Sequence, residues 1–168
     1  MNLENFDQQS TIIINAAFNY AAENNYAYLT PANILEVMLK TNEAVKLTME
    51  HFSINTDSLY LDSQNYSKKS KKKKDNEDTL IQGNVIMLME QAQNEAKKIS
   101  SKKINSNIIL LALTSDISPQ SKLLLEKHGI TYQKLFDFLN SKKEDKNLEL
   151  EFVKKYTVDI TSLALNNK

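Results

Sequence analysis

The chain has 168 residues, a formal net charge of zero and no cysteine, which excludes disulfides, thiolate metal sites and a cysteine nucleophile. Two glycines and two prolines are too few for the tight turns of an all-β fold or for a phosphate-binding glycine loop. All 21 basic residues are lysines, and no apolar run approaches the roughly 20 residues of a membrane span, so we expect a soluble helical protein.

Four helices are predicted in the first half of the chain. Apolar residues at helical spacing predict a long helix over residues 6–24. Thr30 and Pro31 are typical of a helix start, because a threonine side chain can cap the first turn and a proline there has no N–H to lose. Asn42 and Asn55 mark the starts of a third and a fourth helix.

The same plan returns after an offset of about 75 residues. The most regular helical periodicity of the chain covers residues 85–99, and Asn105 stands at the position of Thr30. Ser118 then caps a third helix, as Asn42 does in the first half. The order of caps and apolar positions is kept over roughly sixty residues, which indicates a tandem duplication. Each half alone would be marginally stable, so we expect two four-helix units to pack with pseudo-twofold symmetry into one all-α domain.

A lysine-rich segment joins the two halves. Residues 67–78 read SKKSKKKKDNED, and such a charged block is typical of a solvated loop. We assign repeat one to residues 1–66, repeat two to residues 79–143, and a linker leaving the domain to residues 144–168. The lysines could neutralise phosphates. However, the missing arginines, the adjacent acids and the lack of interleaved aromatic residues argue against nucleic-acid binding.

No catalytic group is predicted. His51 and His128 are the only histidines, near the ends of the two third helices, where a histidine can interact with free carbonyl groups. Neither has a nucleophile or carboxylate spaced for general-base catalysis, and a site using both would lack a third metal ligand. No G-x-x-x-x-G-K-S/T run is present for a nucleotide. We expect no catalytic residue, metal site or cofactor in this chain.

Three short motifs carry a resemblance to a known family. The opening MNLENF and the LTPANIL segment at residues 29–35 are similar to the opening and the "TPEHLL" segment of ClpB proteins. The segment KYTVDIT at residues 155–161 is similar to the one with which ClpB enters its first nucleotide-binding domain. The duplicated four-helix plan also resembles the Clp N-terminal domain.

This resemblance implies the client-binding front domain of an ATP-driven protein disaggregase. The parent protein would be a homohexamer that binds ATP and Mg²⁺ in other domains, and the isolated domain would be a monomer. Its partners would be unfolded or aggregated proteins, without nucleic acid or membrane. Its location would be the cytoplasm or the matrix of a bacterial-derived organelle. Two alternatives stay open: a ClpA- or ClpC-type domain that docks adaptors for a protease, and a stand-alone helical interaction module.

The family is thought to hold unfolded segments in a shallow apolar groove, and apolar area worth about 25 cal/mol per Å² gives weak, sequence-tolerant binding. Carried over by position, the resemblance implies the substrate-binding residues Leu3, Phe6, Asp7, Met89, Gln91, Ser101, Asn107 and Ile108. Gln91 and Glu95 stand where the family often has leucine, so they either make the groove more polar or lie on a solvated face. Residues 108–113 are apolar on every side, which predicts burial in the core or, alternatively, some exposed surface beside the groove.

Overall fold

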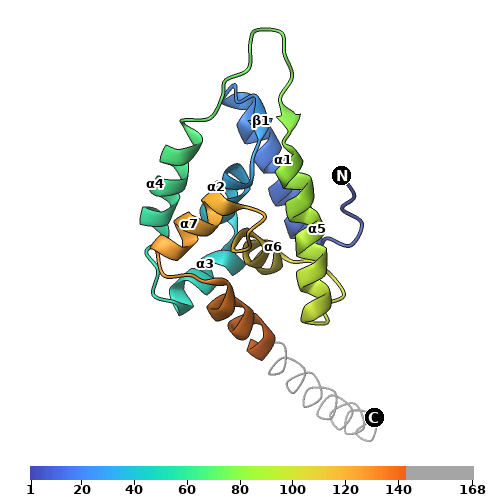
Figure 1. Cartoon of the computed structure of the whole chain (residues 1–168), viewed down its shortest axis with the longest axis vertical. Helices are drawn as coiled ribbons and strands as arrows, with labels where there is room; N and C mark the ends of the chain where they lie inside the picture. The colour runs from blue at the N-terminus through green and yellow to red at the C-terminus, as the bar shows by residue number, and fades with distance from the viewer. Residues whose placement is uncertain (143–168) are drawn as a thin grey trace, which may run out of the picture.

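The structure is a computed structural model that describes residues 1–142, so the predicted linker over residues 144–168 lies outside them. The first half contains α1 Gln8–Glu23, β1 Tyr28–Leu29, α2 Pro31–Thr41, α3 Glu43–His51 and α4 Thr56–Ser67. The second half contains β2 Leu80–Ile81, α5 Gly83–Lys98, α6 Ser106–Leu113, α7 Pro119–Lys127 and a last helix over residues 132–142 (Figure 1). The predicted all-α fold is confirmed, with one short pair of strands added.

Most helices begin where their predicted caps stand. The Asn42 side chain accepts a hydrogen bond from the Val45 N–H at 2.9 Å, and Thr30 forms a reciprocal capping box with Asn33. The predicted start of the first helix was wrong by two residues, because Asp7 is its cap and α1 begins at Gln8. Ser118 was also predicted as a cap. It holds the position before α7, but its side chain makes no capping hydrogen bond.

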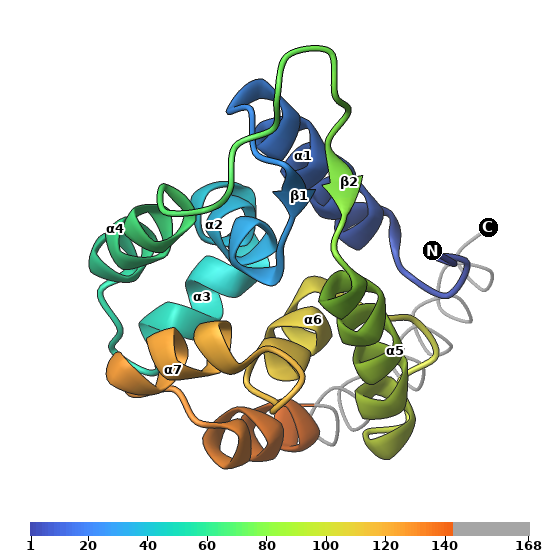
Figure 2. The ribbon, with the colours of Figure 1, turned by 45° about the horizontal axis from the view of Figure 1, so that its top comes forward.

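The two halves exchange extended segments. Phe6, which precedes α1, bridges to Ile104, which follows α5. In the reciprocal pair, Leu29 follows α1 and bonds in parallel register with Ile81, which precedes α5. The steps from Phe6 to Ile81 and from Leu29 to Ile104 are both 75 residues. Figure 2 shows β1 and β2 side by side, with β2 leading directly into α5. This reciprocity is what a duplicated unit related by a pseudo-twofold axis produces.

The second helix of repeat two lies at the centre of the core. Every residue from Ile108 to Leu113 is at most 1% exposed, and α6 is packed against α1, α2, α3 and α5. The expected burial is therefore confirmed, and none of these six side chains supplies exposed surface. Such all-round burial explains why this helix is apolar on every side.

The lysine-rich loop is anchored at its centre, over residues 71–73. The Ala27 N–H donates to the Lys71 carbonyl, and the Lys73 N–H donates to the Asn25 carbonyl, both at 2.8 Å. The Lys72 ammonium donates to the Asn24 carbonyl and lies 4.1 Å from the Tyr26 ring centroid. The expectation of a simple solvated loop was therefore incomplete, since these lysines form an extra short ladder beside β1.

Among residues 1–142, no helix combines the length and the apolar character that crossing a membrane requires.

Candidate functional site

The structure brings the N-terminal segment against the connection between α5 and α6. The Asp7 N–H donates to the Ile104 carbonyl at 3.0 Å, and the Ile104 N–H donates to the Asn5 carbonyl at 2.9 Å. Leu3, Phe6 and Asp7 therefore lie on the segment that pairs with this connection. Of the other residues implied by the resemblance, Ser101 is on the same connection, Met89 and Gln91 are on α5, and Asn107 and Ile108 begin α6.

The apolar members of this set are mostly inside the protein. Met89 is 2% exposed, Ile108 is 1% exposed and Phe6 is also buried, while Leu3 packs against the core from a half-buried position. These side chains stabilise the junction of the two halves and offer little surface to a ligand in this conformation. Their role in client binding stays a prediction.

Three of the polar members make hydrogen bonds within the folded chain. Asp7 accepts from the Ser10 N–H at 2.8 Å and so caps α1. The Asn107 side-chain oxygen accepts from the Thr48 hydroxyl at 2.8 Å, which joins α6 to α3. The Ser101 hydroxyl donates to the Lys103 carbonyl at 2.7 Å. Each therefore has a structural partner in the folded chain.

Glu95 does not lie on a solvated face, contrary to one expectation. Its carboxylate is completely buried and accepts hydrogen bonds from Gln91 at 2.7 Å and from the Tyr132 hydroxyl at 2.7 Å. Lys98 adds an ion pair at 3.3 Å. Burial, followed by the hydrogen bond to Glu95, raises the pKa of Tyr132. This network fixes the last described helix to α5.

Several exposed apolar side chains lie on β1, β2 and the first turns of α5. Leu80 is 58% exposed and Met87 is 50% exposed, and the large apolar side chains of Tyr28, Ile81 and Ile86 are also exposed. We define the β2–α5 surface as these five residues. Tyr28 and Leu80 are cross-strand partners, and β1 is the sole strand paired with β2 in the described chain. The other edge of this two-residue strand is therefore not covered by a strand of residues 1–142.

The sequence analysis did not predict this surface, although the sequence contains a pattern that indicates it. Residues 85–89 read VIMLM, and five successive apolar residues of a helix cannot all face one core. Val85, Leu88 and Met89 are buried, whereas Ile86 and Met87 face outward.

The histidines have structural contacts, though not the predicted ones. The His51 ring stacks on Phe138 of the last helix, with 4.1 Å between ring centroids. His128 Nε2 lies 2.6 Å from an Asp62 carboxylate oxygen and so joins α7 to α4. The hydrogen bond from His128, with a second from Lys127, lowers the pKa of Asp62. In the described part of the chain, no three His, Cys, Asp or Glu side chains are grouped in a way that could hold a metal ion.

Comparisons with known proteins agree with this architecture. The family model of the Clp repeat (R) N-terminal domain matches residues 5–128, and no curated protein sequence matches the chain. A structure from investigations of a malarial protein secretion system is 19% identical with a TM-score of 0.70, and the match covers 83% of this chain and 95% of that one. The N-domain of ClpV from Vibrio cholerae is 19% identical with a TM-score of 0.70, covering 85% of this chain and 87% of that one.

A third solved structure is a complex of a ClpV N-domain with a VipB peptide. It is 19% identical with a TM-score of 0.68, and the match covers 86% of this chain and 93% of that one. At such identities the likeness of all three structures establishes the fold.

Proposed function

Because this chain belongs to the family of Clp repeat (R) N-terminal domains, we propose that it is the client-binding domain of an AAA+ protein disaggregase. In this proposal the domain captures unfolded or aggregated polypeptide and passes it to the pore of a homohexamer. ATP and Mg²⁺ would act in other domains of the parent protein, in the cytoplasm or an organelle matrix. The domain itself contributes binding rather than catalysis.

The β2–α5 surface is the observation that carries this proposal. Its exposed apolar side chains belong to the two strands and to the helix that directly follows β2, and within residues 1–142 no strand pairs with the other edge of β2. An unfolded chain can add to such an edge through main-chain hydrogen bonds, whatever its sequence, and place alternate apolar side chains on the surface. Binding of this kind is weak at one site, and six copies in a hexamer would strengthen it by avidity.

The choice of a ClpB-type parent rests on the motifs at residues 1–6 and 155–161. The complex of a ClpV N-domain of the same fold with a VipB peptide supports a protein-binding role for this domain. An adaptor-docking domain of a ClpA or ClpC type is the second candidate, because a free strand edge would also accept a segment of a folded adaptor.

The test is a titration of the protein with a chemically unfolded polypeptide, followed by amide NMR shifts and by affinity. We expect the shifts to centre on residues 80–87. The double variant Ile86→Ser with Met87→Ser should bind about tenfold more weakly, because two exposed apolar contacts are lost. Leu61→Ser, which alters an equally exposed leucine on α4, is the matched control and should bind like the wild type.

A different result would contradict the proposal. If the shifts gather on Leu3, Phe6, Met89 and Ile108 while the double variant binds normally, clients use the groove implied by the resemblance. A folded adaptor that binds while unfolded chains do not would favour the second candidate.

A further inference from the structure

The centre of the lysine-rich loop forms a third extended segment next to β1 and β2. The Ala27 N–H donates to the Lys71 carbonyl at 2.8 Å, and the Ala27 carbonyl accepts from the Leu80 N–H of β2 at 2.9 Å. Figure 2 shows the loop passing along one side of the chain that leads into β1, turning beyond it and descending on the other side into β2. Residues 71–73 therefore border this small sheet away from β2.

The outer edge of residues 71–73 has an unpaired N–H and an unpaired carbonyl. The peptide groups on both sides of Lys72 are trans. Its N–H therefore points away from the bonded Lys71 carbonyl, and its carbonyl points away from the bonded Lys73 N–H. Within residues 1–142, neither group has a hydrogen-bond partner. An extended peptide can thus add to this edge through a pair of main-chain hydrogen bonds to Lys72.

The side chains along this edge are positively charged. Lysine occupies six of the seven positions of residues 68–74, and five of the six lysines are exposed. None of them forms an ion pair with an acidic residue of the described chain. The nearby Glu77 carboxylate instead accepts from the Lys74 N–H at 3.1 Å and closes the turn at the loop tip. The edge is therefore complementary to an acidic partner.

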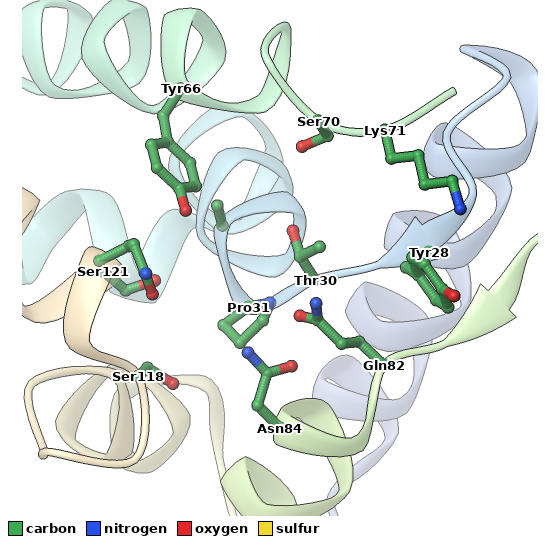
Figure 3. A pocket seen from close by; sticks show the side chains of 12 residues that line it. Tyr28, Thr30, Pro31, Tyr66, Ser70, Lys71, Gln82, Asn84, Ser118 and Ser121 are labelled. Atoms are coloured by element: carbon green, nitrogen blue, oxygen red, sulfur yellow. The ribbon is translucent and has the colours of Figure 1, made fainter. Parts of the chain in front are cut away.

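Two of the lysines of this segment have free ammonium groups. Among residues 71–73, only Lys72 uses its ammonium group in a hydrogen bond within the described chain, to the Asn24 carbonyl at 3.0 Å. Side chains alternate between the faces of an extended segment, so Lys71 and Lys73 lie on the face opposite to Lys72. Figure 3 shows Lys71 extended next to Tyr28. The anchored main chain holds these two charges in place, which lowers the entropy lost when a partner binds.

We propose that residues 71–73 bind an acidic segment of another polypeptide, rich in aspartate and glutamate, as an added strand. Main-chain hydrogen bonds to Lys72 align the segment, and its carboxylates pair with Lys71 and Lys73. The main-chain pairing favours a polypeptide over a nucleic acid or a lipid surface, and the lysines favour acidic over apolar residues. This interaction goes beyond the proposed function, because the β2–α5 surface contacts apolar side chains.

The test titrates the full chain with short capped peptides, followed by fluorescence anisotropy and amide NMR. One peptide alternates glutamate and serine, a second has glutamine in place of each glutamate, and a third is the acidic peptide with a fully N-methylated backbone. We expect the acidic peptide to shift the Lys72 amide and to bind more weakly as salt rises. The other two peptides should bind about tenfold more weakly, because one lacks the charge and the other lacks the main-chain donors.

Several results would overturn the proposal. The glutamine peptide binding as tightly as the acidic one would exclude recognition of charge, and equal binding of the N-methylated peptide would exclude strand addition. A single-stranded oligonucleotide of equal charge, or vesicles of phosphatidylserine, binding as tightly as the acidic peptide would show a general attraction to anions.

Variants separate this edge from the total charge of the protein. Lys71→Gln with Lys73→Gln should weaken binding of the acidic peptide by about fivefold, since two carboxylate partners are lost. Lys97→Gln with Lys102→Gln removes the same charge from exposed positions outside the loop and should leave the affinity within error. Equal losses for the two double variants would overturn the site.

The β2–α5 surface can be tested separately. Since Ile86→Ser with Met87→Ser leaves the lysines intact, this variant should bind the acidic peptide normally even if the proposed client function fails. Loss of acidic-peptide binding in this variant would contradict a separate site on the loop.

Discussion

The Tyr132 hydroxyl donates a 2.7 Å hydrogen bond to the fully buried carboxylate of Glu95, two residues that stand 37 positions apart in the sequence. This contact is the main polar link between the last described helix and α5. Loss of this hydroxyl should therefore weaken the attachment of that helix to α5.

We expect Tyr132→Phe to lower the free energy of unfolding by about 2 kcal/mol, because a buried charged acceptor loses a donor. Urea denaturation measures the change. Tyr60→Phe is the control, since the Tyr60 ring is half-buried and no hydrogen bond of its hydroxyl is found in residues 1–142; it should change stability little. Equal stability of both variants would show that Lys98 and Gln91 suffice for Glu95.

Glu36 should make stability depend on pH. Burial raises its pKa by more than hydrogen bonds from Ser67, Tyr20 and Asn33 lower it. The folded chain then holds the proton more tightly than the unfolded chain. The resulting stabilisation is complete below the ordinary glutamate pKa and is lost as the pH rises through the raised value.

The variant Glu36→Gln cannot ionise and should lack this loss. Relative to the wild type, its free energy of unfolding should therefore rise between about pH 4 and pH 7. Denaturation curves at several pH values test this, with the exposed Glu90→Gln as control. If the difference between Glu36→Gln and the wild type stays constant over that range, the buried carboxyl does not couple folding to protonation.

Shortening a buried side chain of the central helix α6 should strongly lower the free energy of unfolding. Leu111 of α6 is completely buried, so Leu111→Ala should lower the free energy of unfolding by about 2–5 kcal/mol through lost apolar burial and a residual cavity. Leu123→Ala removes the same atoms from a residue that is 66% exposed and should cost less than about 0.5 kcal/mol. A thermal or urea melt compares them, and similar costs would contradict the central position of α6.

The anchored loop can be tested by hydrogen exchange. The buried Thr79 hydroxyl donates to the Tyr26 carbonyl at 2.8 Å, next to the ladder formed by residues 71–73. We expect Thr79→Val to speed exchange of the Ala27 and Lys73 amides about fivefold, since one hydrogen bond of the anchor is lost. Thr41→Val removes a hydroxyl that bonds within α2 and should leave these amides unchanged. Fast exchange of both amides already in the wild type would contradict the ladder.

Local interactions made the helix starts predictable from the sequence. Thr30, Asn42, Asn55 and Asn105 each cap a helix through a backbone N–H three residues away, so the signal and the structure lie within one turn. The apolar character of α6 also predicted its burial, because no solvated face was available.

Interactions between distant segments were not predictable. Glu95 is buried by a tyrosine from the last helix, and the lysine ladder depends on the chain before β1. A cavity of about 330 Å³ is likewise lined by residues from β1, α2, α4, α5 and α7 and from the lysine-rich loop. The sequence alone could not predict that Ser118 fails to cap α7, because this depends on the buried surroundings of its hydroxyl, which has no hydrogen-bond partner in residues 1–142.

The reciprocal pairs Phe6 with Ile104 and Leu29 with Ile81 bear on the ancestry of the fold. In each pair, the segment before the first helix of one repeat pairs with the segment after the first helix of the other repeat. One repeat by itself can therefore form neither pair. A gene that encoded a single repeat could complete both pairs only by self-association about a twofold axis. The present chain has the arrangement of such a dimer after gene duplication and fusion, with the lysine-rich loop as the join.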